Sequence, residues 1–269
     1  MKLTYLGTAA AEGFPAVFCN CTYCNEARTL GGKNIRTRSQ ALINEDLLID
    51  LPADTYFHFL QNGIRGDQIA YLLVTHAHSD HFYPAELEMR RSPFAHKMPV
   101  PKLRVIASEK TLEALSFLPK NVETTPIHAF ETIALGSYRV TALPARHMPE
   151  SEPFIYLIEG EKTLLYAHDT GYLYESVFRY LEEHHIVLDM ISLDCTNMDI
   201  PISDEGSHMG FDQIVRVLAR LASIGAVTAK TVRYVNHFSH NANPVHHLLS
   251  DRAAECECFA SYDGCQVDF

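Results

Sequence analysis

Short apolar runs, separated by polar turns and amphipathic stretches, are the main pattern along the chain. The apolar runs predict strands at residues 3–6, 40–44, 47–51, 69–75, 103–107, 122–128, 138–143, 154–158, 163–167, 190–193, 231–235 and 266–269. Apolar residues at helical spacing predict helices at residues 54–61, 84–91, 109–117, 174–183, 212–222 and 244–254. These elements form two similar halves, which favours an α/β (α+β) protein whose two packed sheets carry helices outside, a four-layer αββα sandwich.

The length and composition suit a single folded unit. With 269 residues, of which 47% are hydrophobic, the chain is long enough to bury a large core. No low-complexity segment or linker interrupts the pattern, so we expect one domain over residues 1–269. Residues 91–101 contain three prolines and predict a mobile lobe beside the functional site, and residues 144–153 predict a rim loop.

The formal net charge of −11 opposes broad affinity for nucleic acid, because polyanion binding depends on clustered Lys and Arg. The basic clusters at residues 33–38 and 88–91 are therefore interpreted as solvated surface. No apolar run reaches the roughly 18 residues that suggest a membrane span, and the first residues lack the apolar segment of a signal peptide. Seven cysteines without a disulfide pattern fit a reducing compartment, so we expect a cytoplasmic protein.

A dense cluster of metal-binding residue types, His76-Ala77-His78-Ser79-Asp80-His81, follows a predicted buried strand. Imidazole nitrogens and carboxylate oxygens are ligands for zinc and similar divalent ions. In an extended segment residues i and i+2 point the same way, so His76 and His78 can bind one ion. After the following turn, Asp80 and His81 face another direction and can hold a second ion. The alternative interpretation is a histidine-rich surface loop.

Further potential ligands follow three other predicted strands: His147, Asp169 and His237. In sheets covered by helices, sites form outside the carboxyl ends of the strands, because the loops there converge. Four strands that deliver His or Asp at the same end predict a hydrolytic site with two metal ions.

The order HxHxDH, a lone His, a lone Asp and a final His resembles the metallo-β-lactamase fold superfamily, and no position of that pattern is missing. The resemblance implies that His76, His78 and His147 bind one metal ion. It implies that Asp80, His81 and His237 bind the other, with Asp169 bridging the two. Asp80 is also assigned a catalytic role. The two ions, Zn or Mn, would share a water and lower its pKa so that a hydroxide attacks the substrate.

The amino-terminal region contains Cys19, Cys21 and Cys24 at CxCxxC spacing. A structural zinc requires four ligands, and His240 is the candidate for the fourth. The alternative is three reduced thiols without a special role. We interpret Cys195, Cys256, Cys258 and Cys265 as ordinary thiols.

The opening GTxxxEGxP, the CxCxxC motif and a late HFSH together resemble the phosphonate-pathway cyclic phosphodiesterases (phosphoribosyl 1,2-cyclic phosphate hydrolases). They resemble the pyrroloquinoline-quinone biosynthesis protein B less closely. The first resemblance implies that His208 protonates the leaving group, a role that suits imidazole because its pKa lies near neutrality. The alternatives for His208 are a loop residue without catalytic function or a side chain that orients a metal ligand. Two roles are equally plausible for Asp194: it orients a ligand histidine, or it caps a turn.

These observations favour a metal-dependent phosphodiesterase that acts on a small, cyclic or open phosphate ester, with two divalent ions at the active site and one structural zinc. The alternatives are an RNA-processing nuclease of the same fold and a non-catalytic binding or carrier protein in cofactor biosynthesis. Expected partners are the phosphate-ester substrate, with neither membrane nor nucleic acid, and a homodimer is left open.

Overall fold

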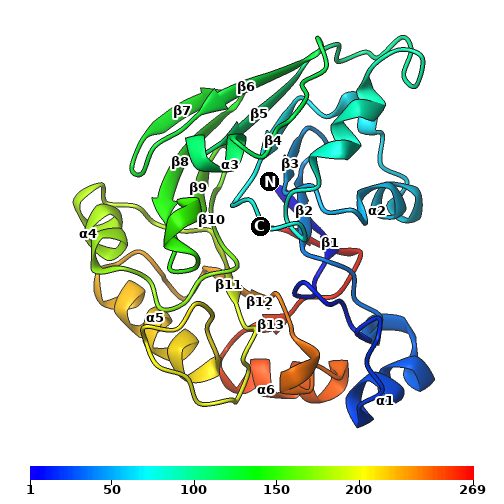
Figure 1. Ribbon diagram of the computed structural model, residues 1–269. Helices are drawn as coiled ribbons and strands as arrows, with labels where there is room; N and C mark the ends of the chain where they lie inside the picture. Colours follow the sequence, from blue (N-terminus) through cyan, green and yellow to red (C-terminus); the bar gives the residue numbers. More distant parts are fainter.

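The computed structural model describes residues 1–269, and two sheets form its centre (Figure 1). The first sheet has the strand order β14 (Cys265–Asp268), β1 (Lys2–Gly7), β2 (Gln40–Ile43), β3 (Leu47–Ile49), β4 (Tyr71–Leu73), β5 (Leu103–Ala107) and β6 (Val122–Pro126). The second has the order β13 (Phe259–Ala260), β12 (Val232–Asn236), β11 (Met190–Asp194), β10 (Thr163–Ala167), β9 (Phe154–Glu159), β8 (Tyr138–Pro144) and β7 (Thr132–Leu135). Both are mixed sheets of seven strands.

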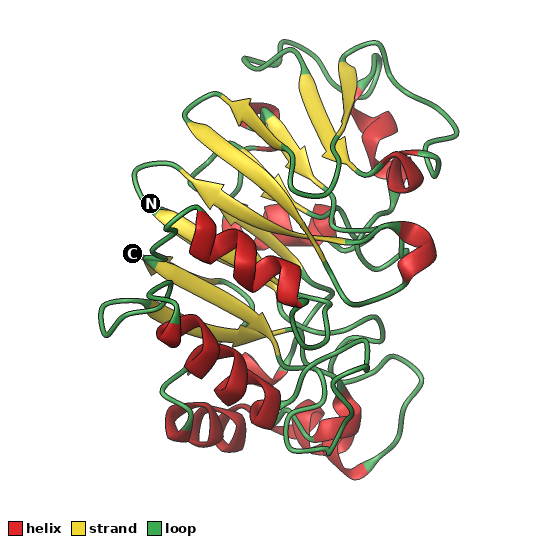
Figure 2. Ribbon diagram, turned by 90° about the vertical axis from the view of Figure 1, so that its left-hand side faces the viewer, coloured by secondary structure: helices red, strands yellow, loops and turns green.

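Helices lie on the outer faces of the two sheets (Figures 1 and 2). They are α2 (Thr55–Asn62), α3 (Glu109–Leu112), α4 (Glu175–Glu183), α5 (Phe211–Ser223) and α6 (His246–Glu255). Helix α1 (Thr22–Leu30) lies apart from both sheets, and its Cys24 and Ala27 form a small apolar cluster with Val245. No helix is both long and apolar enough to cross a membrane.

Three apolar clusters define the layers. The cluster between the sheets joins side chains of both, among them Tyr5 and Ile43 from the first and Tyr156 from the second. A second cluster packs β8–β12 against α4, α5 and α6, and a third packs the opposite face of the first sheet beside α2. Central strands such as β9 are covered on both faces, so their residues are apolar without alternation, whereas the edge strands β6 and β14 contain exposed polar residues. The predicted αββα sandwich is therefore confirmed.

Parallel pairing brings the ends of several strands to one edge. Strands β3, β4, β5 and β6 run parallel to one another, as do β10, β11, β12 and β13. The carboxyl ends of parallel strands lie at the same edge of a sheet, where functional sites of covered sheets form. The fold therefore presents the loops after β4, β10 and β12 to a common region.

The structure differs from the sequence prediction in a few elements. Helix α1, strand β7 and the short strand β13 were not expected. The predicted helix at residues 84–91 is a 3-10 helix, Pro84–Arg90. Helix α3 ends at Leu112 instead of residue 117, because the amides of Ala114 and Leu115 bond to carbonyls three residues earlier, which tightens the chain into 3-10 turns.

Candidate metal centre

The loops after β4, β8, β10 and β12 bring all seven predicted ligands of the active site together. They form two groups, each with its candidate ligand atoms within 4.8 Å of one another. The groups are His76, His78, His147 and Asp169, and Asp80, His81, Asp169 and His237. Residues that are far apart along the chain thus meet at one edge of the sandwich, as expected from the strand ends.

Three residues at this edge hold a left-handed backbone. The φ angles are +65° at Asp50, +53° at Asp169 and +64° at His237, each within one or two residues of the end of its strand. Residues other than glycine adopt this backbone conformation at a cost of about 1–3 kcal/mol. The conformation persists where the surrounding structure fixes it. Its repeated occurrence at the strand ends indicates a functional constraint on the local backbone.

In the first group, three ring nitrogens and one carboxylate oxygen converge. His78 Nδ1 lies 2.8 Å from His76 Nε2 and 3.1 Å from His147 Nε2. Asp169 Oδ2 lies 3.0 Å from His76 Nε2. Burial lowers the pKa of His78 and lowers the pKa of His147 to about 4. Both rings are therefore neutral near pH 7, which is the form that binds metal ions.

The second group shares Asp169 with the first. His81 Nε2 lies 3.3 Å from Asp80 Oδ2 and 3.1 Å from Asp169 Oδ2. His237 Nε2 lies 3.9 Å from Asp169 Oδ1, so the two oxygens of this carboxylate face different imidazoles. Asp169 therefore has the position of a bridging ligand between two adjacent ions.

The outward nitrogens of these rings contact further polar groups. His81 Nδ1 donates a 2.7 Å hydrogen bond to Asp50 Oδ2, and His237 Nδ1 lies 2.8 Å from Thr196 Oγ1. Such contacts fix the ring orientation and tautomer of a metal ligand. His76 Nδ1 lies 3.0 Å from Thr75 Oγ1, and His147 Nδ1 lies 3.3 Å from the carbonyl of Ser207.

Sequence reasoning missed Asp50 and Thr196. Asp50 is fully buried and also accepts hydrogen bonds from the amide and hydroxyl of Thr75. The sequence feature that could have identified Asp50 is an Asp directly after the buried strand β3. The same kind of feature identified Asp169 after β10. Thr196 follows Asp194 at the end of β11, but a single Thr after a strand does not by itself indicate a metal site.

His208 lies beside both groups, in the loop between β11 and α5. Its Nδ1 is 3.2 Å from Asp194 Oδ2 and 3.1 Å from Asp169 Oδ1. Burial opposes the charged imidazole, but the carboxylate of Asp194 prevails and raises the pKa of His208 to about 9. Asp194 also accepts the amides of Thr196 and Met209, so it both orients His208 and holds the surrounding loop.

The donor set fits two divalent metal ions. The atoms His81 Nε2, His237 Nε2 and Asp169 Oδ1 are buried, and none of them makes a hydrogen bond. Buried polar atoms without partners are costly in a folded protein and call for a ligand or ion. Neutral imidazoles and carboxylates are the ligands that zinc and manganese sites use.

A polar pocket of about 370 Å³ opens above the two groups. Beside the metal-binding residues it is lined by Ala10, Ala11, Glu12, Thr196, Asn197, His208, Ser239 and Asn241. The expectation that residues 91–101 form a wall of the site was wrong. Residues 94–96 and Met98 line a separate, mainly apolar pocket beside α2, on the outer face of the first sheet. Of the predicted rim loop, Met148 contacts the ring of His78 through its sulfur.

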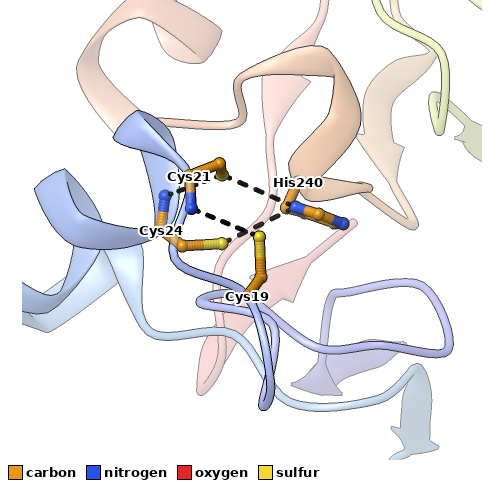
Figure 3. Close-up of side chains that lie close together, drawn as sticks. All are labelled: Cys19, Cys21, Cys24 and His240. Carbon is orange, nitrogen blue, oxygen red and sulfur yellow. Dashed lines mark hydrogen bonds between the residues drawn. The ribbon is translucent and has the colours of Figure 1, made fainter.

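The predicted cysteine cluster forms where α1 begins, at some remove from the strand ends (Figure 3). Cys19, Cys21, Cys24 and His240 have their ligand atoms within 4.8 Å of one another. His240 Nδ1 lies 3.8 Å from the sulfur of Cys21 and 3.6 Å from that of Cys24. In Figure 3 all four side chains point toward a common centre, three from the α1 region and one from the turn after β12.

This cluster fits a single tetrahedral zinc. With metal–sulfur bonds of about 2.3 Å, neighbouring ligand atoms of a tetrahedron lie about 3.8 Å apart. The contact with His240 lowers the pKa of Cys21 to about 6, whereas burial raises the pKa of Cys24 to about 11. Thiolate is the metal-binding form of cysteine. The other cysteines are buried and unpaired: Cys195, Cys256, Cys258 and Cys265.

Known proteins share this architecture. A family model described as "Beta-lactamase superfamily domain" matches residues 49–231. A diphosphatase from the PhnP family superimposes with a TM-score of 0.75 at 22% sequence identity, covering 100% of this chain and 96% of that chain. Zn²⁺-bound PqqB from Methylobacterium extorquens superimposes with a TM-score of 0.72 at 21% identity, covering 100% of both chains.

Two further proteins are similar to this chain, one in structure and one in sequence. A metallo hydrolase from Ignicoccus hospitalis has a TM-score of 0.60 at 14% identity, covering 100% of both chains. The UPF0173 protein PF0020 of Pyrococcus furiosus is 29% identical over 105 residues, which is 39% of this chain and 45% of that protein, so the match spans under half of that relative. Because the family model covers more than half of the chain, this protein belongs to the beta-lactamase superfamily, and its structure has the metallo-β-lactamase fold.

Proposed function

We propose that this protein is a metal-dependent hydrolase, a phosphodiesterase that acts on a small phosphate ester, open or cyclic. The observation that carries the proposal is the pair of ligand groups that share Asp169 on the floor of a polar pocket, with His208 beside them. The cofactors would be two ions of Zn or Mn at these groups and one Zn at the cysteine cluster. The single-domain organisation, the cytoplasmic location and a homodimer stay predictions.

Two divalent ions held this way supply positive charge that lowers the pKa of a bound water and neutralises charge on phosphorus oxygens during in-line displacement. The chain provides the remaining parts of the reaction. Asp169 and Asp80 place two negative charges beside the ions. Asp80 also lines the pocket, where its carboxylate is an acceptor for a hydrogen bond from the attacking water.

His208 is the proton donor for the leaving group. It lines the pocket, and its Nδ1 faces Asp194, which leaves Nε2 free to donate a proton. The raised pKa of His208 keeps this ring protonated at neutral pH, and proton donation to a departing alkoxide is worth roughly 10²–10⁴-fold in rate. A buried carboxylate that holds the ring, as Asp194 does, supports this role.

Two other functions have less support. An RNA-processing nuclease requires cationic side chains along its substrate path, yet no Lys or Arg lines the pocket. A binding or carrier protein in cofactor biosynthesis requires no ligands for a second ion, yet both groups are complete here. The carrier alternative also gives no role to His208, which lies 3.1 Å from Asp169.

The direct test is hydrolysis of bis(p-nitrophenyl) phosphate by protein that was stripped of metal and reloaded with Zn or Mn. We expect turnover that returns with either metal. A p-nitrophenyl monoester, a β-lactam and a thioester serve as comparison substrates at equal concentration. Faster turnover of any of these than of the diester, or no turnover of the diester with either metal, contradicts the proposal.

A further inference from the structure

One polar side chain of the pocket has no partner within the chain. Asn197 lines the pocket, and its Nδ2 is buried without a hydrogen bond. Other polar groups of the lining hold one another instead: Ser239 Oγ donates a 2.6 Å hydrogen bond to Glu12, and the side-chain amide of Asn241 donates to Ser239 Oγ at 3.1 Å. A carboxamide carries both donor hydrogens and an acceptor oxygen, and leaving such groups unpaired in a buried site is costly. The free amide of Asn197 therefore calls for a hydrogen-bonding group from a molecule in the pocket.

The backbone around Asn197 is fixed, so this side chain has a defined position. Its main-chain amide donates to the carbonyl of Met209 at 3.0 Å, and the amide of Phe211 donates to the carbonyl of Met198 at 2.7 Å. Gly210 permits this close approach, because a Cβ there would lie 2.4 Å from the carbonyl oxygen of Met198. The turn after β11 and the loop before α5 therefore form one unit.

The same unit carries His208, the proposed proton donor. Asn197 directly follows Thr196, whose Oγ1 lies 3.3 Å from His208 Nδ1. Both Asn197 and His208 line the pocket. In the hydrolysis of a diester a hydroxide bonds to phosphorus, the bond to the leaving oxygen breaks, and that oxygen takes the proton of His208. The wall that contains Asn197 therefore lies on the side of the leaving alcohol.

We propose that Asn197 is a specificity-determining residue whose amide forms a hydrogen bond with a second hydroxyl group of the leaving alcohol. The inference rests on the proposed phosphodiesterase function and names the class of alcohol that the site releases, a diol or polyol. A hydroxyl group both donates and accepts, so it pairs with either end of the amide. An alcohol that lacks this group leaves the amide of Asn197 unpaired when the substrate fills the pocket, and a site discriminates against such analogues for that reason.

The test uses one diester with two arms of equal length, 3-hydroxypropyl butyl phosphate, and the zinc-loaded protein. Release of 1,3-propanediol leaves butyl phosphate, whereas release of butanol leaves 3-hydroxypropyl phosphate, and phosphorus NMR measures both products. Their ratio equals the ratio of kcat/KM for the two orientations of one substrate, so differences in metal content or protein concentration cancel. We expect the wild type to release propanediol in excess.

The variant Asn197→Leu keeps the approximate size of the side chain but removes both ends of the amide. We expect the excess of propanediol over butanol to fall about fivefold, the effect of one lost hydrogen bond. Because the two alcohols differ in their intrinsic ability to leave, the comparison of variant with wild type carries the result. Asn197→Ala is the second variant, and we expect the same direction of change. The matched control is Asn25→Leu, at an exposed position of α1 outside the pocket, which keeps the wild-type ratio.

The outcomes separate this inference from the proposed function. An unchanged product ratio in either variant of Asn197, or an equal change in Asn25→Leu, overturns the role of Asn197 and leaves the phosphodiesterase function intact. Hydrolysis of bis(p-nitrophenyl) phosphate without release of either alcohol from the mixed diester also overturns this role, because the hydroxyl-bearing arm should be accepted. No hydrolysis of either diester, with zinc content intact, overturns the proposed function itself.

Discussion

The two metal-binding regions of this chain use similar donors but are built in opposite ways. The active-site groups collect residues from four strand ends, lie deep beneath a pocket and share a bridging carboxylate. The cysteine cluster takes three ligands from one short segment and a fourth from one turn, and none of the four lines that pocket. The first arrangement leaves room for a substrate, whereas four protein ligands around one ion close the coordination shell.

This difference assigns separate physical tasks to the two regions. An open site of histidines and carboxylates supports chemistry, because water and substrate can reach the ions that it would hold. A closed site of three cysteines and one histidine contributes folding free energy, because the metal joins His240 to cysteines that lie more than 200 positions earlier in the chain. Loss of the first should remove activity and keep the fold, whereas loss of the second should lower stability and largely keep activity at low temperature.

The largest effect is expected from Asp169→Ala. This change removes the ligand shared by both groups, so we expect phosphodiesterase activity to fall by roughly 10³-fold or more. The metal content should drop while the zinc of the cysteine cluster stays, which elemental analysis measures. His78→Ala, which removes a ligand of one group only, is the companion variant. Substantial activity in either variant after metal depletion contradicts the assignment of the site.

His208→Gln should have the next largest effect, and the effect should depend on the leaving group. For diesters with an alkoxide leaving group we expect a loss of roughly 10²–10⁴-fold, because alkoxides need a proton to depart. For p-nitrophenyl esters the loss should be clearly smaller, since p-nitrophenolate leaves without one. Equal losses for both kinds of substrate at unchanged metal content would argue against proton donation by His208.

Asp50→Asn tests the partner behind the metal ligand His81. The amide keeps the size of the side chain but removes the charge that holds the imidazole at Nδ1. Loss of such a partner typically weakens metal affinity about 10–100-fold. We expect a metal titration of the stripped protein to shift by that factor, with nearly full activity at saturating metal. An unchanged titration would show that the carboxylate of Asp50 is not needed to hold His81.

Cys21→Ser should have the smallest effect on activity and a clear effect on stability. We expect the free energy of unfolding to fall by roughly 3 kcal/mol, which corresponds to a melting temperature lower by about 6–12 °C. Turnover at low temperature should stay within a few-fold of the wild type. Cys195→Ser, at a buried cysteine outside the cluster, controls for the loss of a thiol. Three metal ions per chain in both wild type and Cys21→Ser would contradict the zinc assignment.

The sequence identified the ligands better than it identified their surroundings. His76 to His81, His147, Asp169 and His237 were predictable because ligand chemistry and strand ends are local properties of the chain. His240 was predictable from its closeness to His237 and from the three cysteines that lacked a fourth donor. Asp50 was missed because a single carboxylate after a strand has many ordinary explanations.

The sequence did not predict where segments distant from the ligands lie in the fold. The prolines in residues 91–101 correctly indicated an irregular segment, but they do not specify on which face of the sheet it lies. Helix α1 was missed because the spacing of its cysteines was interpreted as a ligand pattern alone. Cys21 is in fact also the residue that caps the helix, since its sulfur accepts a hydrogen bond from the amide of Cys24.

The turn after β12 carries a ligand for each of the two metal-binding regions, His237 for one and His240 for the other. A ribosome makes this turn only after all the other donors, so a nascent chain lacks a member of both coordination sets until residue 240 has emerged. Docking of this one turn against the GTxxxEG segment completes both sets together.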